Sequence, residues 1–185
     1  MKTMKTLLPM LLLVLWTACG TSEKETATSK TAEMVERIQG MEDSLFNSGD
    51  FNMRNAQALL DVYKAYAAAY PLDSLAPEYL FRAAGVAKSM RDPEQSVFLY
   101  DRIIKDYPSW DRLADTYYLK AFTFDSEMDR KGEAQQAYQQ VIDQFPDHPF
   151  AEQARLSIQN LQYTDEELVA KFKRMAEEEA ARKAQ

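Results

Sequence analysis

The residues of this chain that could support chemistry are few and lie far apart in the sequence. Cys19 is the only cysteine and His148 the only histidine among 185 residues. A zinc site needs three or four clustered ligands, and His148 has no second imidazole or thiolate to join it. A serine hydrolase needs a histidine base beside its nucleophile, and the sequence has no glycine-rich phosphate loop. We therefore expect no catalytic residue, no metal site and no cofactor, and we interpret His148 as a loop residue.

The amino-terminal segment has the organisation of a secretion signal. Lys2 and Lys5 precede an apolar run over residues 7–16, and two small residues then lead into Cys19. This run is too short for a transmembrane helix, which needs about 20 apolar residues. The order resembles the signal of bacterial lipoproteins, which implies lipid attachment to Cys19. An ordinary secretion signal followed by an unrelated cysteine is the alternative.

The lipoprotein resemblance also implies a location and a division of the chain. Gly20 follows the cysteine where an inner-membrane retention signal would place Asp, which favours an anchor in the outer membrane. The periplasmic face is the expected location, and Glu23 and Glu25 leave the cell surface as an alternative. Residues 20–30 contain no large apolar side chain and are expected to be flexible. The expected parts are a signal peptide (1–18), a lipidated cysteine with its tether (19–30) and a folded domain (31–185).

The charge of the chain excludes one class of partner. Asp and Glu total 29 against 22 Lys and Arg, which gives a formal net charge of −7. An acidic surface repels the phosphates of nucleic acids and the headgroups of anionic lipids. We therefore expect no nucleic-acid partner, and we expect membrane attachment only through lipid on Cys19.

A repeat of helical segments organises the remainder. From Thr31 onward apolar residues recur with helical spacing and no strand-like alternation is present. Three segments end in an aromatic residue followed by proline, and the prolines are 37 and 38 residues apart. The aligned residues are Tyr63, Tyr100 and Tyr138 inside the segments, Tyr70, Tyr107 and Phe145 before the prolines, and Pro71, Pro108 and Pro146. A period of this size is typical of a solenoid of helical hairpins, in which each hairpin buries its apolar face against its neighbours.

The repeat resembles the tetratricopeptide repeat family. Leu80, Ala83, Ala84 and Ala87 fall on the first-helix positions of that family, and Ser96, Tyr100 and Ile103 fall on its second-helix positions. The stretch around residues 142–161 is similar to repeats of bacterial envelope lipoproteins, including the outer-membrane β-barrel assembly lipoprotein and the Tol-Pal coordinating protein. We expect an all-α, tetratricopeptide-like helical-hairpin solenoid of about four hairpins, over residues 31–70, 75–107, 110–145 and 149–183.

The family resemblance also implies a binding surface, because the first helix of each hairpin lines a concave groove. Tyr118 and Phe122 lie beside the apolar face of their helix, four residues apart. Together with Phe81 and Arg82 of the preceding repeat, they are the candidates for contacting a partner. The alternative, which the sequence leaves open, is that these aromatic residues pack between repeats.

The function expected from these features is that of a non-catalytic, lipid-anchored adaptor. It would bind another protein of the cell envelope, with outer-membrane assembly or maintenance as the process that the resemblance implies. A periplasmic carrier that holds a peptide, glycan or lipid ligand in an aromatic-lined pocket is the alternative. The sequence does not identify the partner.

Overall fold

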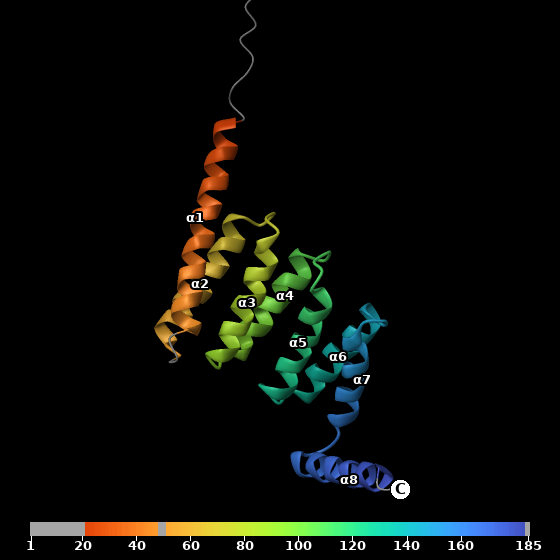
Figure 1. Ribbon diagram of the computed structural model, residues 1–185. Coiled ribbons are helices and arrows are strands. Elements are labelled where there is room, and N and C mark those ends of the chain that lie inside the picture. Colours follow the sequence, from red (N-terminus) through yellow and green to blue (C-terminus); the bar gives the residue numbers. More distant parts are fainter. Residues whose placement is uncertain (1–20, 48–50, 184–185) are drawn as a thin grey trace, which may run out of the picture. The chain divides into compact units, whose positions relative to one another are not determined.

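The computed structural model describes residues 21–47 and 51–183, which form eight α-helices and no strand (Figure 1). The predicted all-α class is therefore confirmed, whereas residues 1–18 and Cys19 lie outside the described residues. The chain divides into two units between residues 36 and 37, and the packing below is that of residues 37–183. The helices are α1 (Thr21–Phe46), α2 (Met53–Ala69), α3 (Leu75–Ser89), α4 (Pro93–Asp106), α5 (Leu113–Ser126), α6 (Lys131–Gln144), α7 (Pro149–Asn160) and α8 (Asp165–Lys183).

Consecutive helices from α2 to α7 pack against one another. Each of these helices contacts the next one in the chain, and α5 also contacts α7. Antiparallel neighbours of this kind form hairpins, and the additional α5–α7 contact stacks the first helix of one hairpin on the first helix of the next. The arrangement is the helical-hairpin solenoid that the sequence predicts.

The aromatic-proline stops adopt one backbone conformation in all three repeats. The last residues of α2, α4 and α6 are followed by Tyr70, Tyr107 and Phe145, with φ of −129°, −131° and −135° and ψ of 60°, 57° and 55°. Each of the three amides donates a hydrogen bond to the carbonyl four residues earlier. The proline that follows has no amide with which to continue the helix. The chain therefore leaves each second helix in the same direction.

The core is built from the repeated tyrosines and from alanines. Tyr63, Tyr100 and Tyr138 are buried, as the repeat predicts. The first-helix alanines Ala83, Ala84 and Ala87 are also buried, since a small side chain lets two helices approach closely. The repeat thus fixes which residues form the core of each hairpin.

Side-chain caps begin several helices. Asp92 accepts a hydrogen bond from the Gln95 amide at 3.0 Å, and Thr164 and Glu167 form a reciprocal capping box. Asn52 caps α2, and His148 caps α7 by accepting a hydrogen bond from the Phe150 amide at its Nδ1. The only histidine of the chain therefore has a local structural role, since its side chain begins a helix.

Two segments differ from the expectation. Residues 21–30, expected to be flexible, belong to α1. This segment contains no glycine or proline and five Glu, Lys or Ala residues among its ten, which favour helix. At the other end, the fourth hairpin expected over residues 149–183 has Phe172 and Met175 of its second helix half exposed. The two helices of the predicted fourth hairpin, α7 and α8, are thus both present, but the apolar side of α8 remains exposed.

Candidate functional site

A chain of charged residues connects the end of α1 with α3 and with the segment just before α5. Arg82 on α3 donates to Glu42 on α1 at 2.8 Å and to Glu78 on its own helix at 2.9 Å. Arg112, just before α5, donates to the other oxygen of Glu78 at 2.9 Å. We call Glu42, Arg82, Glu78 and Arg112 the charge ladder. It ties successive hairpins together along the candidate binding face.

The two acids of the charge ladder, Glu78 and Glu42, are held by hydrogen bonds from neighbouring side chains. Burial acts to raise the pKa of Glu78, but the hydrogen bonds from Arg82 and Arg112 outweigh it and hold the pKa below its usual value. Glu42 accepts a second hydrogen bond from the buried hydroxyl of Tyr63. Burial, followed by this hydrogen bond, raises the pKa of Tyr63, so the phenol stays protonated and remains a donor.

A hollow of about 440 Å³ lies beside the ladder. Its apolar wall includes Phe46, whose side chain is 60% exposed, and Val86. Gly85 lies at its edge, where an added Cβ would meet no atom within 4 Å. The full lining is Glu42, Phe46, Tyr63, Arg82, Gly85, Val86 and Ser89. We call this space the α1–α3 hollow. It combines an apolar surface with an ion pair at its border.

Two of the four predicted contact residues pack between helices. The Phe81 ring centre lies 5.9 Å from that of Tyr100 and 5.5 Å from that of Trp110. The Arg112 guanidinium lies 4.0 Å from the centre of the same ring, within the range of a cation–π contact. Phe81 therefore joins α3 to α4 and to the start of α5.

Tyr118 has the corresponding role one repeat later. Its ring stacks on Phe150 of α7, with centres 4.5 Å apart and an angle of 7°, and lies 5.7 Å from Tyr138 of α6. Tyr118, like Phe81, therefore makes ring contacts with neighbouring helices.

The other two candidates lie at the surface. Arg82 borders the α1–α3 hollow, and its side chain is 45% exposed. The Phe122 ring has Lys88 of α3 at 5.4 Å from its centre, and Lys88 also pairs with Glu127 at 3.9 Å. The structure thus places Arg82 beside a hollow and Phe122 in a charged setting between α3 and α5. The sequence analysis did not single out Glu42, Phe46 and Gly85, which line the α1–α3 hollow.

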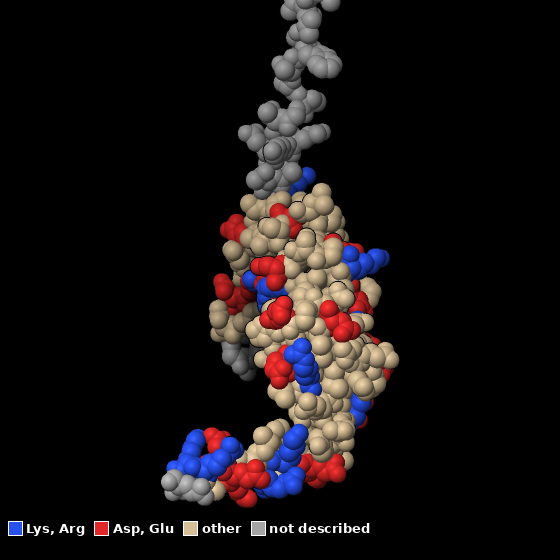
Figure 2. All heavy atoms as spheres, turned by 90° about the vertical axis from the view of Figure 1, so that its right-hand side faces the viewer, with Lys and Arg blue, Asp and Glu red and all other residues tan. Residues whose placement is uncertain are grey.

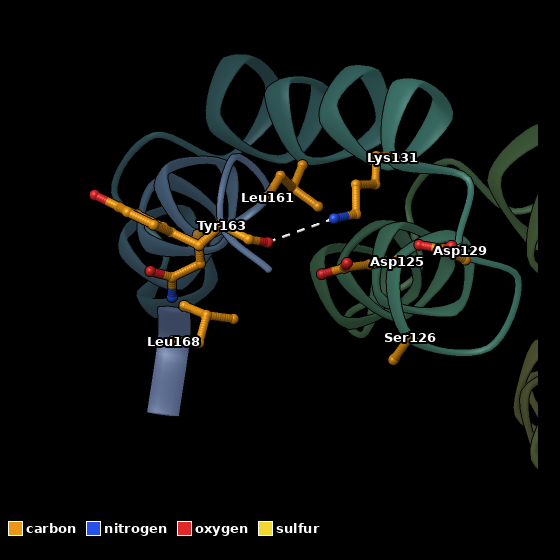
Figure 3. A pocket seen from close by; sticks show the side chains of 8 residues that line it. Asp125, Ser126, Asp129, Lys131, Leu161, Tyr163 and Leu168 are labelled. Atoms are coloured by element: carbon orange, nitrogen blue, oxygen red, sulfur yellow. Dashed lines mark hydrogen bonds between the residues drawn. The ribbon is translucent and has the colours of Figure 1, made fainter. Parts of the chain in front are cut away.

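A second hollow, also of about 440 Å³, has a polar lining (Figure 3). Lys131 donates to the carbonyl of Tyr163 at 3.5 Å, and Leu161 and Leu168 lie nearby. Burial raises the pKa of Asp125, although the hydrogen bond from the Tyr138 hydroxyl opposes the shift.

No group of three or more His, Cys, Asp or Glu within the described residues has a metal-binding arrangement. Among the described helices, none is long and apolar enough to cross a membrane.

The comparison with known families follows the hairpins. Residues 78–109 and 114–148 match the family model described as "Tetratricopeptide repeat". The first match covers most of α3 and all of α4, and the second covers α5 and α6. The predicted tetratricopeptide resemblance is therefore confirmed for these two hairpins, and such repeats generally mediate protein–protein interactions. A search of curated proteins found no match to the chain.

Proposed function

We propose that the chain is a non-catalytic adaptor that binds another protein through the face formed by α1, α3 and α5. The observation that carries the proposal is the α1–α3 hollow, an open apolar space bordered by the charge ladder. It lies next to hairpins similar to tetratricopeptide repeats, which generally bind proteins. A helical or extended segment of a partner could place an apolar side chain against Phe46 and Val86.

The proposed setting is the cell envelope. The order of Lys2, Lys5, the apolar run over residues 7–16 and Cys19 supports a lipid anchor. One acyl chain gives only marginal membrane binding, so several chains on Cys19 would be needed for stable attachment. We propose the periplasmic face of the outer membrane, and a role there in assembly or maintenance of that membrane. The rings of Phe81 and Tyr118, which the carrier alternative would use, pack against rings of neighbouring helices, and this favours the adaptor over the carrier.

The binding face is tested by filling the hollow. Gly85→Trp places a large side chain where the backbone leaves open space, and Gly132→Trp on α6 is the matched control because its site is also open. In-cell crosslinking followed by mass spectrometry should recover an envelope protein with the wild type and with Gly132→Trp, and much less with Gly85→Trp. Thermal unfolding would establish that both variants are folded. Unchanged crosslinks with a folded Gly85→Trp variant would exclude this face, and recovery of no protein partner would contradict the adaptor.

The anchor is tested separately. Cys19→Ser should release the protein from the membrane fraction and abolish incorporation of labelled palmitate. Retention of both properties in Cys19→Ser would overturn the lipid assignment and leave the binding face untouched. Protease treatment of intact cells would then distinguish the periplasmic face from the cell surface, because only an exposed protein is digested.

A further inference from the structure

The apolar side of α8 lacks the cover that the corresponding helices have. In α4 and α6, the residues seven and ten positions after the first helical residue are buried: Tyr100, Ile103, Tyr138 and Val141. The same positions of α8 hold Phe172 and Met175, and each is 53% exposed. Val169 beside them is also 53% exposed. A helix with this pattern is expected to be covered by another helix.

The contacts at the start of α8 argue against cover by its own α7. Lys171 donates to Asn160 at the end of α7, at 3.0 Å, and its ammonium lies 4.6 Å from the centre of the Tyr163 ring. The corresponding residues of α4 and α6 are Leu99 and Ala137, both buried. Folding α8 back in the same manner would bury the Lys171 ammonium, which is costly without a partner. The open side of α8 is therefore available to another chain.

The charges of α8 specify which chain fits. They form four consecutive blocks along the helix: acidic at 165–167, basic at 171–174, acidic at 177–179 and basic at 182–183. Figure 2 shows red and blue groups alternating along this last helix at the lower end of the view. Successive residues of a helix are rotated by about 100° around its axis, so each charge block places side chains on more than one side of the helix. Two such helices in antiparallel orientation bring opposite blocks together, whereas parallel helices bring like blocks together.

We propose that two copies of this chain pair through α8 in antiparallel orientation. The pairing covers Val169, Phe172 and Met175, and its two-fold axis passes near residue 174, the midpoint of the helix. The net charge of −7 makes the remaining surface repel a second copy, so the alternating blocks of α8 direct the contact to this helix. The proposed dimer leaves the α1–α3 hollow of each copy outside the contact, so the two proposals stand or fall separately.

The apolar part of the interface is tested with two differently tagged, full-length copies expressed in the same cells. Wild-type copies should purify together. Phe172→Glu should lower the recovered second copy about tenfold, because a charge would replace a central apolar contact. Phe98→Glu is the matched control, since Phe98 is 61% exposed on α4 and should not affect pairing. Failure of wild-type copies to associate, or equal loss in the Phe98→Glu control, would overturn the proposal.

The orientation is tested by exchanging charge blocks between copies. One variant carries Glu177→Lys, Glu178→Lys and Glu179→Lys, and the other carries Lys173→Glu and Arg174→Glu. Lys171 is left intact because it holds the start of α8. Either variant should fail to pair with itself, since like blocks would then meet, and the two variants should pair with each other. Unaltered self-pairing of both variants, or no pairing of the mixture when circular dichroism shows both folded, would contradict antiparallel association.

Discussion

Replacing Tyr118 by alanine should separate a packing residue from a binding residue. Truncation of a fully buried large aromatic side chain costs about 3–5 kcal/mol. Tyr118 is only partly buried but contacts rings on α6 and α7, so we expect a loss of about 2–3 kcal/mol in the free energy of unfolding. For a chain of this size, that corresponds to a fall of about 4–12 °C in Tm. The expected cause is loss of the stacked contact with Phe150, which connects successive hairpins.

Two further variants make the Tyr118 test specific. Tyr118→Phe keeps the ring and should change stability by less than about 0.5 kcal/mol if the ring contacts dominate. Phe122→Ala should cost less than Tyr118→Ala, because its recorded contacts are a looser stack 6.5 Å from Tyr118 and a surface lysine. Urea unfolding followed by circular dichroism measures all three. A loss below about 1 kcal/mol for Tyr118→Ala, or a larger loss for Phe122→Ala, would refute the packing assignment.

Three other substitutions have expected outcomes from local structure. Gly85→Ala should stabilise the protein by about 0.5–1 kcal/mol in thermal unfolding, because the added methyl meets open space inside a helix. Glu78→Gln should reduce stability at neutral pH. The pKa of Glu78 is lower in the folded protein than in the unfolded chain, where it is about 4.3, so the ionised carboxylate stabilises the fold above that pH. This contribution is lost as the pH falls through the folded pKa. A pH series of urea midpoints should therefore be flatter for Glu78→Gln below that value. Arg91→Gly should raise the urea midpoint, since Arg91 has a φ of 62° that glycine adopts without strain.

The sequence predicts the hairpins because their signals are local and repeated. Tyr63, Tyr100 and Tyr138 recur at nearly equal intervals, and the proline after each second helix removes a backbone donor at a known place. Both features act within one repeat, so no knowledge of the neighbouring repeat is needed to interpret them. The same is true of the Asp92 cap, which requires only the residues that follow it.

The binding face is less predictable because its members are brought together from distant segments. Glu42 lies 40 residues from Arg82, and Glu78 lies 34 residues from Arg112. Helical spacing places a side chain on one face of its own helix, but it does not show which neighbouring side chain will meet that face. Helical spacing therefore places Tyr118 beside the main apolar face of its helix, but it does not show that the ring stacks on Phe150 of α7.

The two ends of the described chain show where periodicity fails as a guide to packing. Residues 21–30 lack large apolar side chains, which predicted a flexible segment, but helix formation also depends on residues that permit the backbone geometry. In α8, the apolar residues have the spacing of a packed second helix, but Val169, Phe172 and Met175 are each 53% exposed within the described part of the chain. Periodicity identifies a face suited to burial, and the covering surface must come from elsewhere.

The charge ladder also limits what can select a partner at the α1–α3 hollow. Arg82 is already bonded to two carboxylates, so an incoming acidic group would approach Glu42 and Glu78 as well as the guanidinium. An incoming basic group would compete with Arg82 for the same carboxylates. Neither charge gains a large advantage from such a neutralised cluster in solvent. The exposed side chain of Phe46 and the open space at Gly85 offer an apolar surface at this border, so an apolar side chain of the partner is the expected determinant of binding.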